Sequence, residues 1–451
     1  MTEVAGRPGP TALATDVVER NAPRHLAHSP SQLVTPLTLL VLANAVSLSG
    51  NVIMTVAIPW LVLTRTGSAA LAGIAVFAGV GGAAIGGLAA GRIVDALGPV
   101  RTSSAADLLS GLAVAPLPIL LWLDALEIWH VVLLAVVGTL ADSAGSTARQ
   151  SLVPAAADSG GYLRERANAL FTTAEHVGYL VGAPIAGLLI ATFDVDGALW
   201  VTVASFAFAA LVVARLVRLP GPRAVATTTE RAGLREAIAF IWRDPALRAL
   251  VVFPTAAVLL VGPLVPLVLP VLAREAFGDP IVLGVMVASY GAGGLLGAAG
   301  FGMLGSHIPR RRLYLGIFVV WPGTYAAITL VPVLPVTLAM LLTLGAAAGS
   351  LVPLQATIRQ ERSPARLLPR VVGLSTASVP VVAPTGVLVT GFLIEGLGLH
   401  ETLLLMTAGA VLVGTTVLTS RGTRAFDAGG HAPRGSPRVT QVGPEPPTGG
   451  F

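Results

Sequence analysis

The run AALAGIAVFAGVGGAAIGGLAA occupies residues 69–90 and contains no charged side chain over its 22 positions. The hydrocarbon core of a bilayer is about 30 Å thick, so a helix of about 20 apolar residues crosses it. This run therefore predicts a transmembrane helix. Charged residues return directly after it, in the segment GRIVDALGPVR at residues 91–101.

Eleven other stretches have similar length and apolar character. The sequence thus predicts an all-α membrane protein with twelve transmembrane helices, at 36–63, 69–90, 104–123, 128–148, 168–192, 197–217, 247–272, 281–304, 313–332, 335–357, 371–394 and 400–420. Composition agrees, because 54% of the residues are hydrophobic and only 11% are charged. A soluble protein carries about 25% charged residues to cover its surface.

Several classes of site are excluded by what the sequence lacks. There is no cysteine, which removes disulfides, thiolate metal ligands and cysteine nucleophiles. The sequence also has no Gly-Lys-Ser/Thr phosphate loop, no nucleophile elbow and no spaced metal-binding cluster. We therefore expect no metal, no cofactor and no enzymatic activity.

The distribution of arginine predicts the orientation in the membrane. All 28 basic residues are arginine, and only Arg65 and Arg274 fall in loops on the predicted outer side. Positive residues are retained in the cytoplasm, so both termini are predicted to be cytoplasmic in a multi-pass protein of the cell (plasma) membrane. The sequence pI of about 10.3 then reflects charge facing cytoplasm and anionic lipid headgroups, an interpretation favoured over nucleic-acid binding.

The chain divides into two similar halves. Segment 91–101 after the second span resembles segment 302–312 after the eighth, and Arg149-Gln150 resembles Arg359-Gln360. We therefore predict two six-helix pseudo-repeat bundles with a substrate site between them. The predicted domains are a disordered cytoplasmic N-terminal tail (1–32), the first bundle (33–217), a cytoplasmic central linker (218–246), the second bundle (247–420) and a disordered cytoplasmic C-terminal tail (421–451).

The loop after the second span carries the pattern Gly-x-x-x-Asp-x-x-Gly-x-x-Arg, formed by Gly91, Asp95, Gly98 and Arg101. With twelve spans and a repeated half, this pattern resembles the major facilitator superfamily over residues 33–420. The sequence departs from the family at Pro99-Val100, where further basic residues are frequent.

A second motif resembles the antiporter motif of drug-efflux members, usually written G-x-x-x-G-P-x-x-G-G. It comprises Gly178, Gly182, Pro184 and Gly187, with Ala183 standing between the second glycine and the proline. Residues 153–170 also resemble the macrolide-efflux and enterobactin-exporter branch. These resemblances imply export more than uptake.

The Asp95 loop is predicted to act as a conformational latch. Asp95 would dock on the amino-terminal end of the eleventh span near residues 371–374, where free amides and the helix dipole favour negative charge. The family resemblance implies that this contact holds the outward-open state, with Arg101 and Asp107 completing an ionic cluster. The alternative is an ordinary solvated loop.

Four ionisable residues inside predicted spans are candidates for proton coupling. Asp142 and Arg149 lie in the fourth span region and Glu175 and His176 in the fifth. Charged groups within a membrane usually face an aqueous cavity and serve transport. Asp142 or Glu175 would exchange the proton, with Arg149 tuning it and His176 as an accessory. The alternative is a structural Arg149–Glu175 ion pair.

The first span carries a polar stripe that is predicted to line the cavity. Asn44, Ser47, Asn51 and Thr55 recur at helical spacing and so share one face. The alternative is hydrogen bonding between helices. This span has no acidic residue, which weakens the case for a strongly cationic cargo.

The sequence therefore predicts a secondary active transporter. Its expected activity is proton-coupled efflux of a small amphipathic compound, such as a drug, antibiotic, siderophore or secondary metabolite, by alternating access. The expected partners are that small molecule, protons and membrane lipids, with the protein acting as a monomer. The alternatives are a proton-linked importer of a small metabolite and a non-transporting membrane sensor with the same fold.

Overall fold

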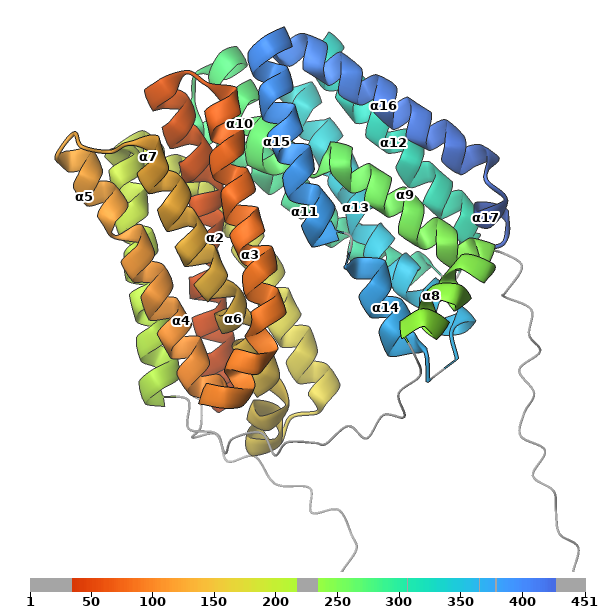
Figure 1. Ribbon diagram of the computed structural model, residues 1–451, viewed down its shortest axis with the longest axis horizontal. Coiled ribbons are helices and arrows are strands. Elements are labelled where there is room, and N and C mark those ends of the chain that lie inside the picture. The colour runs from red at the N-terminus through yellow and green to blue at the C-terminus, as the bar shows by residue number, and fades with distance from the viewer. Residues whose placement is uncertain (1–34, 217–233, 306, 365, 378, 427–451) are drawn as a thin grey trace, which may run out of the picture. The chain divides into compact units, whose positions relative to one another are not determined.

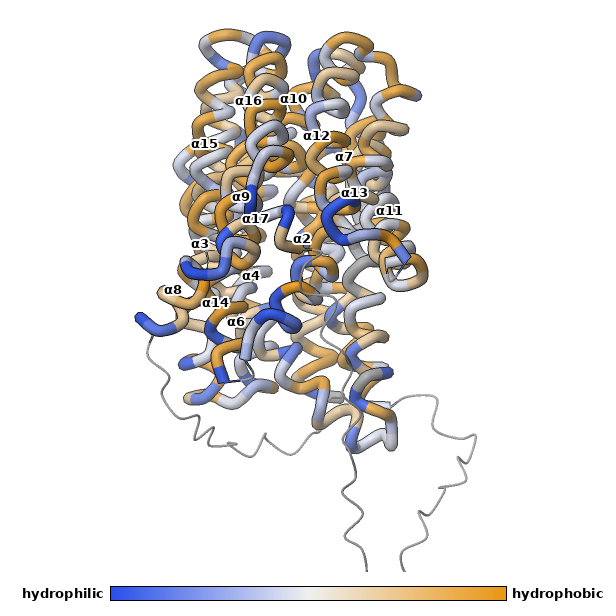
Figure 2. Tube along the Cα trace, turned by 90° about the vertical axis from the view of Figure 1, so that its right-hand side faces the viewer, coloured by the Kyte–Doolittle hydropathy of each residue, from blue (hydrophilic) through white to orange (hydrophobic). Residues whose placement is uncertain are grey.

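The computed structural model describes residues 35–216, 234–305, 307–364, 366–377 and 379–426. Every regular element in these ranges is a helix, which confirms the predicted all-α class (Figure 1). Hydrophobic residues run along the helices, and most hydrophilic stretches lie near their ends and turns (Figure 2). Eleven helices of the described chain are long and apolar enough to cross a membrane.

The helices of the first predicted bundle begin at or near the apolar runs. Proline opens α2, α4 and α5, where its missing N–H is not needed by the helix. The elements are α2 (Pro36–Thr66), α3 (Ala69–Leu97), α4 (Pro99–Val114), α5 (Pro116–Trp122), α6 (Ile128–Gly160) and α7 (Arg164–Leu216).

Helix α7 contains two of the predicted spans. It has 53 residues, but its backbone leaves the helical region at Asp194, with φ 56° and ψ −176°. A continuous helix of this length would measure about 80 Å, far more than a bilayer. The break falls between the predicted spans 168–192 and 197–217, so the two arms of α7 coincide with those two predicted spans.

The second half of the chain is more broken. Helix α8 (Leu234–Arg243) falls within the predicted linker, and α17 (Arg421–Arg424) falls within the predicted tail. The elements between them are α9 (Pro245–Val261), the π-helix η1 (Leu264–Val268), α10 (Leu269–Leu272), the π-helix η2 (Ala273–Phe277), α11 (Pro280–Leu304), α12 (Arg310–Leu330), α13 (Leu334–Arg362), α14 (Leu368–Thr376), α15 (Val379–Leu397) and α16 (Leu399–Thr419). Prolines explain the break after α9, because Pro263 and Pro266 cannot donate to the helical ladder. The Tyr325 hydroxyl donates to the Leu260 carbonyl at 3.0 Å and satisfies an acceptor beside this break.

Small residues allow helix backbones to touch. A Cβ atom added to Gly297 of α11 would lie 1.9 Å from the Ala346 carbonyl oxygen of α13. Such close approach is the usual way in which membrane helices gain packing energy without a hydrophobic driving force.

The ordered chain extends beyond the predicted end of the second bundle. The predicted tail starts at residue 421, but α17 occupies Arg421–Arg424 and Phe426 is buried. The Phe426 ring packs edge-on against Tyr314, with ring centroids 5.0 Å apart. One buried aromatic residue therefore anchors this segment, and residues 427–451 lie outside the described chain.

Candidate functional site

A buried arginine lies inside the first predicted bundle. Arg149 of α6 is 2% exposed and Asp107 of α4 is completely buried. Arg149 Nη1 donates to both carboxylate oxygens of Asp107, at 2.8 and 2.9 Å. Arg149 Nε donates to Asn44 Oδ1 of α2 at 3.0 Å. The side chain thus joins three helices.

Asp107 is also held from α2. The Ser47 hydroxyl donates to Asp107 Oδ1 at 2.8 Å. A buried charge is tolerated only when it is paired and hydrogen-bonded, and here each member of the pair has several partners. We call Arg149, Asp107, Asn44 and Ser47 the buried ionic cluster.

Asp142 connects this cluster to a cavity. It lies seven residues before Arg149 on α6, and its Oδ1 is 3.6 Å from Arg149 Nη2. Asn51 Nδ2 of α2 donates to Asp142 Oδ2 at 3.0 Å. The Asp142 side chain is 20% exposed, whereas Asp107 is sealed. One guanidinium therefore faces two carboxylates, of which only Asp142 is accessible.

The cavity beside Asp142 has a volume of about 520 Å³, which is in the size range of small-molecule sites. Residues of α2, α3, α4, α6, α7 and η1 line it, and most of them are apolar. Within the described lining, Asp142 is the single ionisable side chain. An amphipathic molecule would meet an apolar wall with one titratable group.

The predicted stripe of α2 is divided between two environments. Asn51 and Thr55 line the cavity, as does Thr139 of α6. Asn44 and Ser47 are instead buried in the ionic cluster, 4% and 0% exposed. Both interpretations of the stripe thus describe part of it, because one end faces the cavity and the other faces Arg149.

The predicted latch residues are not assembled in this structure. Gly91, Asp95 and Arg101 are exposed, and neither Asp95 nor Arg101 has a hydrogen bond or ion pair within the described residues. Gly98 has φ 80°, which favours glycine at the α3–α4 turn. The predicted cluster of Arg101 with Asp107 is corrected, because Asp107 lies about 9 Å further along α4 and faces Arg149.

The antiporter-like motif lies at helix–helix contacts of α7. Cβ atoms added to Gly178 and Gly182 would lie 3.2 Å from Leu48 and Val52 of α2. One added to Gly187 would lie 2.5 Å from the Pro280 carbonyl oxygen, at the start of α11. Pro184 lies inside α7 between them. The motif therefore packs α7 against both predicted bundles.

The predicted Glu175 and His176 cannot be placed in this network, because their side chains lie outside the described residues. The alternative ion pair between Arg149 and Glu175 therefore stays a prediction. The described contacts of Arg149 engage its Nε, Nη1 and Nη2 atoms with other partners.

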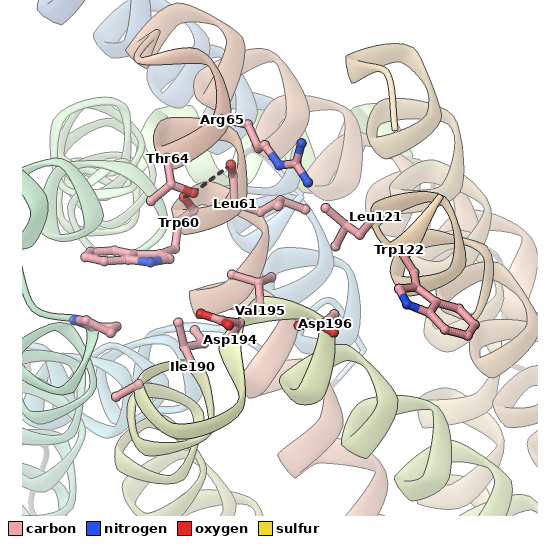
Figure 3. Close-up of a pocket in the computed structure, with 12 residues that line it drawn as sticks. Trp60, Leu61, Thr64, Arg65, Leu121, Trp122, Ile190, Asp194, Val195 and Asp196 are labelled. Carbon is pink, nitrogen blue, oxygen red and sulfur yellow. Dashed lines mark hydrogen bonds between the residues drawn. The ribbon is translucent and has the colours of Figure 1, made fainter. Parts of the chain in front are cut away.

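A second cavity of about 640 Å³ lies at the end of the helices predicted to be extracellular. Figure 3 shows Trp60 and Trp122 on opposite sides of it, with Asp194 and Asp196 at the break in α7. Arg65 in its wall is paired with Asp124 at 3.0 Å. The two cavities share no lining residue, so the Asp142 cavity is separate from this one.

Comparison with known protein families identifies the family to which the chain belongs. The model of the Major Facilitator Superfamily matches residues 40–272 and 261–442. The chain belongs to the Major Facilitator Superfamily. This agrees with the resemblance predicted from the Asp95 loop, and it makes the protein a multi-pass membrane transporter and not an enzyme.

Several relatives within the Major Facilitator Superfamily are named as drug-efflux proteins. The chain is 33% identical to the multidrug efflux pump Tap of Mycolicibacterium fortuitum over 399 residues, 87% of this chain and 97% of that protein. It is 23% identical to macrolide efflux protein A of Streptococcus pyogenes over 377 residues, 80% of this chain and 90% of that one.

A solved structure of a transporter supports the fold. The crystal structure of the nucleoside transporter NupG superimposes with a TM-score of 0.70 at 13% sequence identity, covering 85% of this chain and 98% of the other. Identity this low supports the shared fold alone.

Sequence reasoning missed the pairing of Asp107 with Arg149. A signal was present, because Asp107 stands inside the predicted span 104–123 and a charge within a membrane needs a partner. Its position shortly after the Asp95 loop motif led to its being grouped with Arg101 and that loop instead. Placing it required knowing which face of α4 meets α6.

Proposed function

We propose that this transporter exports a small amphipathic compound from the cytoplasm in exchange for protons. Support comes from the accessible Asp142 carboxylate, which lines the cavity and lies 3.6 Å from Arg149. The names of the relatives, a multidrug efflux pump and a macrolide efflux protein, support export and an amphipathic cargo.

The proposed coupling uses the difference between the two carboxylates around Arg149. Ionised Asp142 is attracted to the guanidinium and accepts a hydrogen bond from Asn51. Protonation cancels that attraction, while Asp107 keeps the guanidinium paired and in place. Proton gain and loss at Asp142 would thus change how tightly α6 holds α2 without leaving a buried charge unpaired.

In this proposal the two bundles, 33–217 and 247–420, rock about the cavity, with the 218–246 linker and both tails in the cytoplasm. The protein acts as a monomer in the plasma membrane. Each proton entering down a potential of about 100 mV supplies about 2.3 kcal/mol, enough for a modest outward concentration gradient of cargo.

Transport in inside-out vesicles tests the proposal. Radiolabelled erythromycin serves as the macrolide probe, and a panel of fluorescent amphipathic dyes widens the search. We expect Asp142→Asn to reduce gradient-driven uptake into these vesicles by about tenfold or more, because loss of one coupling carboxylate removes the driving force. The matched control is Asp158→Asn, which alters an exposed carboxylate on the same helix, paired with Arg164.

Three outcomes would contradict the proposal. Uphill uptake by Asp142→Asn equal to the wild type would remove Asp142 as the coupling group and leave Glu175 to be tested by Glu175→Gln. Movement in the opposite direction would favour the importer. No cargo-stimulated proton movement across the whole panel would favour the sensor.

A further inference from the structure

The amino terminus of α3 is capped by a carboxylate from a distant helix. Ala69 N donates to Glu395 Oε2 at 2.9 Å, and Ala70 N donates to the same oxygen at 3.3 Å. Glu395 belongs to α15, 326 residues beyond Ala69 and in the other predicted bundle. The contact lies at the end of the helices predicted to be extracellular.

This cap completes the hydrogen bonding of the first turn of α3. Ser68 Oγ accepts from Leu71 N at 3.1 Å, and Thr66 Oγ1 accepts from Ser68 N at 3.1 Å. Only the amides of Ala69 and Ala70 remain, and Glu395 accepts from both. A negatively charged acceptor is favoured at the amino terminus of α3, because the free amides and the helix dipole both create a positive potential there.

Glu395 is poorly placed for its own helix. It lies in the last turn of α15, which ends at Leu397, where the dipole disfavours a negative charge. The benefit of the carboxylate therefore lies in its contact with α3.

The helix backbones touch beside this contact. A Cβ atom added to Gly391 would lie 2.9 Å from the Ala69 carbonyl oxygen and 3.2 Å from Gly73 Cα. The small residues let the backbones of α3 and α15 come into direct contact. The hydrogen bonds of Glu395 to α3 can therefore form only when this end of the two helices is closed.

The opposite end of the same helix pair carries a matching but unengaged acid. Asp95 lies two residues before the end of α3 and Glu395 two residues before the end of α15, and each helix is followed by a glycine. Gly98 has φ 80° and Gly398 has φ 92°. Transporters of this kind contain inverted repeats, which place equivalent segments at opposite membrane faces. Asp95 is exposed, while Glu395 is bonded.

We propose that Glu395 and the amino terminus of α3 form the latch that closes the predicted extracellular end. Asp95 is its inverted counterpart for the cytoplasmic end, and the two contacts alternate during the cycle. The inference rests on the alternating-access part of the proposed function and is independent of the cargo and the coupling ion.

Distances between spin labels test this latch. The chain contains no cysteine, so introduced cysteines are labelled without background. One pair, Trp122→Cys with His400→Cys, reports the predicted extracellular end, and a second pair, Leu163→Cys with Met303→Cys, reports the other end. All four positions are exposed in the structure.

Glu395→Gln keeps the shape of the side chain but removes its charge, and Glu395→Ala removes the acceptor. We expect Glu395→Ala to raise the ratio of open to closed molecules at the Trp122–His400 end about fivefold, the usual effect of losing a helix cap. Glu395→Gln should give a smaller shift in the same direction. Glu401→Gln, an exposed acid of the first turn of α16, is the matched control.

Compensation makes the test specific. Asp95→Asn should shift both distance distributions in the direction opposite to the shift caused by the Glu395 variants. The double variant, Asp95→Asn with Glu395→Gln, should return toward the wild-type ratio of open to closed molecules. Unchanged distances in both Glu395 variants would overturn the latch, as would a lowered melting temperature without any shift in distances. If the distances shift but erythromycin is not exported, the proposed function fails and the latch stands.

Discussion

Arg149 and Arg359 occupy equivalent places in the two repeated halves but have very different partners. Arg149 pairs with Asp107 and faces Asp142, on α4 and α6. Arg359 is nearly as buried, 5% exposed, yet it donates to the backbone oxygen and side-chain amide oxygen of Gln355, one turn earlier on its own helix. The first bundle thus pairs its buried arginine with carboxylates, whereas the second pairs its buried arginine with neutral acceptors on the same helix.

The ion pairs seen among the described residues of the second half of the chain lie elsewhere, at the predicted cytoplasmic ends of the helices. Arg362 of α13 pairs with Asp244, which also caps α9, and Arg366 pairs with Glu236 of α8. Arg310 pairs with Glu361. These partly exposed pairs fasten helices at the rim. This contrast supports the proposal that the first bundle couples ions, whereas the ion pairs described in the second hold its helices together.

The largest effect is expected when one member of the buried Asp107–Arg149 pair is removed. Asp107→Ala leaves the Arg149 guanidinium buried without its main partner, which costs about 3–5 kcal/mol of stability. Thermal unfolding in detergent with bound-dye detection measures the loss. Asp107→Ala combined with Arg149→Leu should recover part of it, because the second change removes the unpaired charge. A loss below about 1 kcal/mol would mean that the pair does not hold the bundle together.

Much of the architecture could be predicted from sequence, because each apolar run is a local property. The division of α7 was predictable in this way, since Asp194 and Asp196 interrupt two apolar stretches. The Asp107–Arg149 pair was not, because it depends on the rotation of α4 about its axis. Glu395 was missed for a related reason: it falls just past the predicted span 371–394, where an acid resembles an ordinary loop residue.

The candidate site was predicted in the same uneven way. Asp142, Asn51 and Thr55 line the cavity as expected, because a polar residue in an apolar helix must face water or another polar group. The stripe of α2 could not reveal where the cavity ends and the buried cluster begins. That boundary lies between Ser47 and Asn51, and only the packing of α4 and α6 sets it.

A smaller effect is expected at the rim of the second bundle. Arg362→Gln breaks the 3.1 Å pair with Asp244 and the hydrogen bond to the Ala425 carbonyl oxygen. Both charged side chains are about one-fifth exposed. We therefore expect the free energy of unfolding to fall by about 1–2 kcal/mol, less than for the loss of a buried pair. Thermal unfolding and limited proteolysis after residue 420 measure it. The pair Arg164–Asp158, which is more than half exposed, serves as the control through Arg164→Gln. Equal losses in the two variants would contradict a fastening role for Arg362.

The smallest effect is expected from Gln355, the side-chain partner of the buried Arg359 in the second bundle. Gln355→Ala removes a neutral acceptor from Arg359 but leaves the backbone oxygen of residue 355 in place, so the arginine keeps one partner. We expect a loss of about 1 kcal/mol, typical of one hydrogen bond, and transport within about twofold of the wild type. Vesicle uptake and thermal unfolding on the same preparation measure both quantities. A transport defect as large as that of Asp142→Asn would show that the second bundle also couples ions, because a neutral amide with a purely structural contact has no route to affect the driving force. A loss of stability without a transport defect, however large, would instead give Gln355 a purely structural role. The difference between the partners of Arg149 and Arg359 would then still hold.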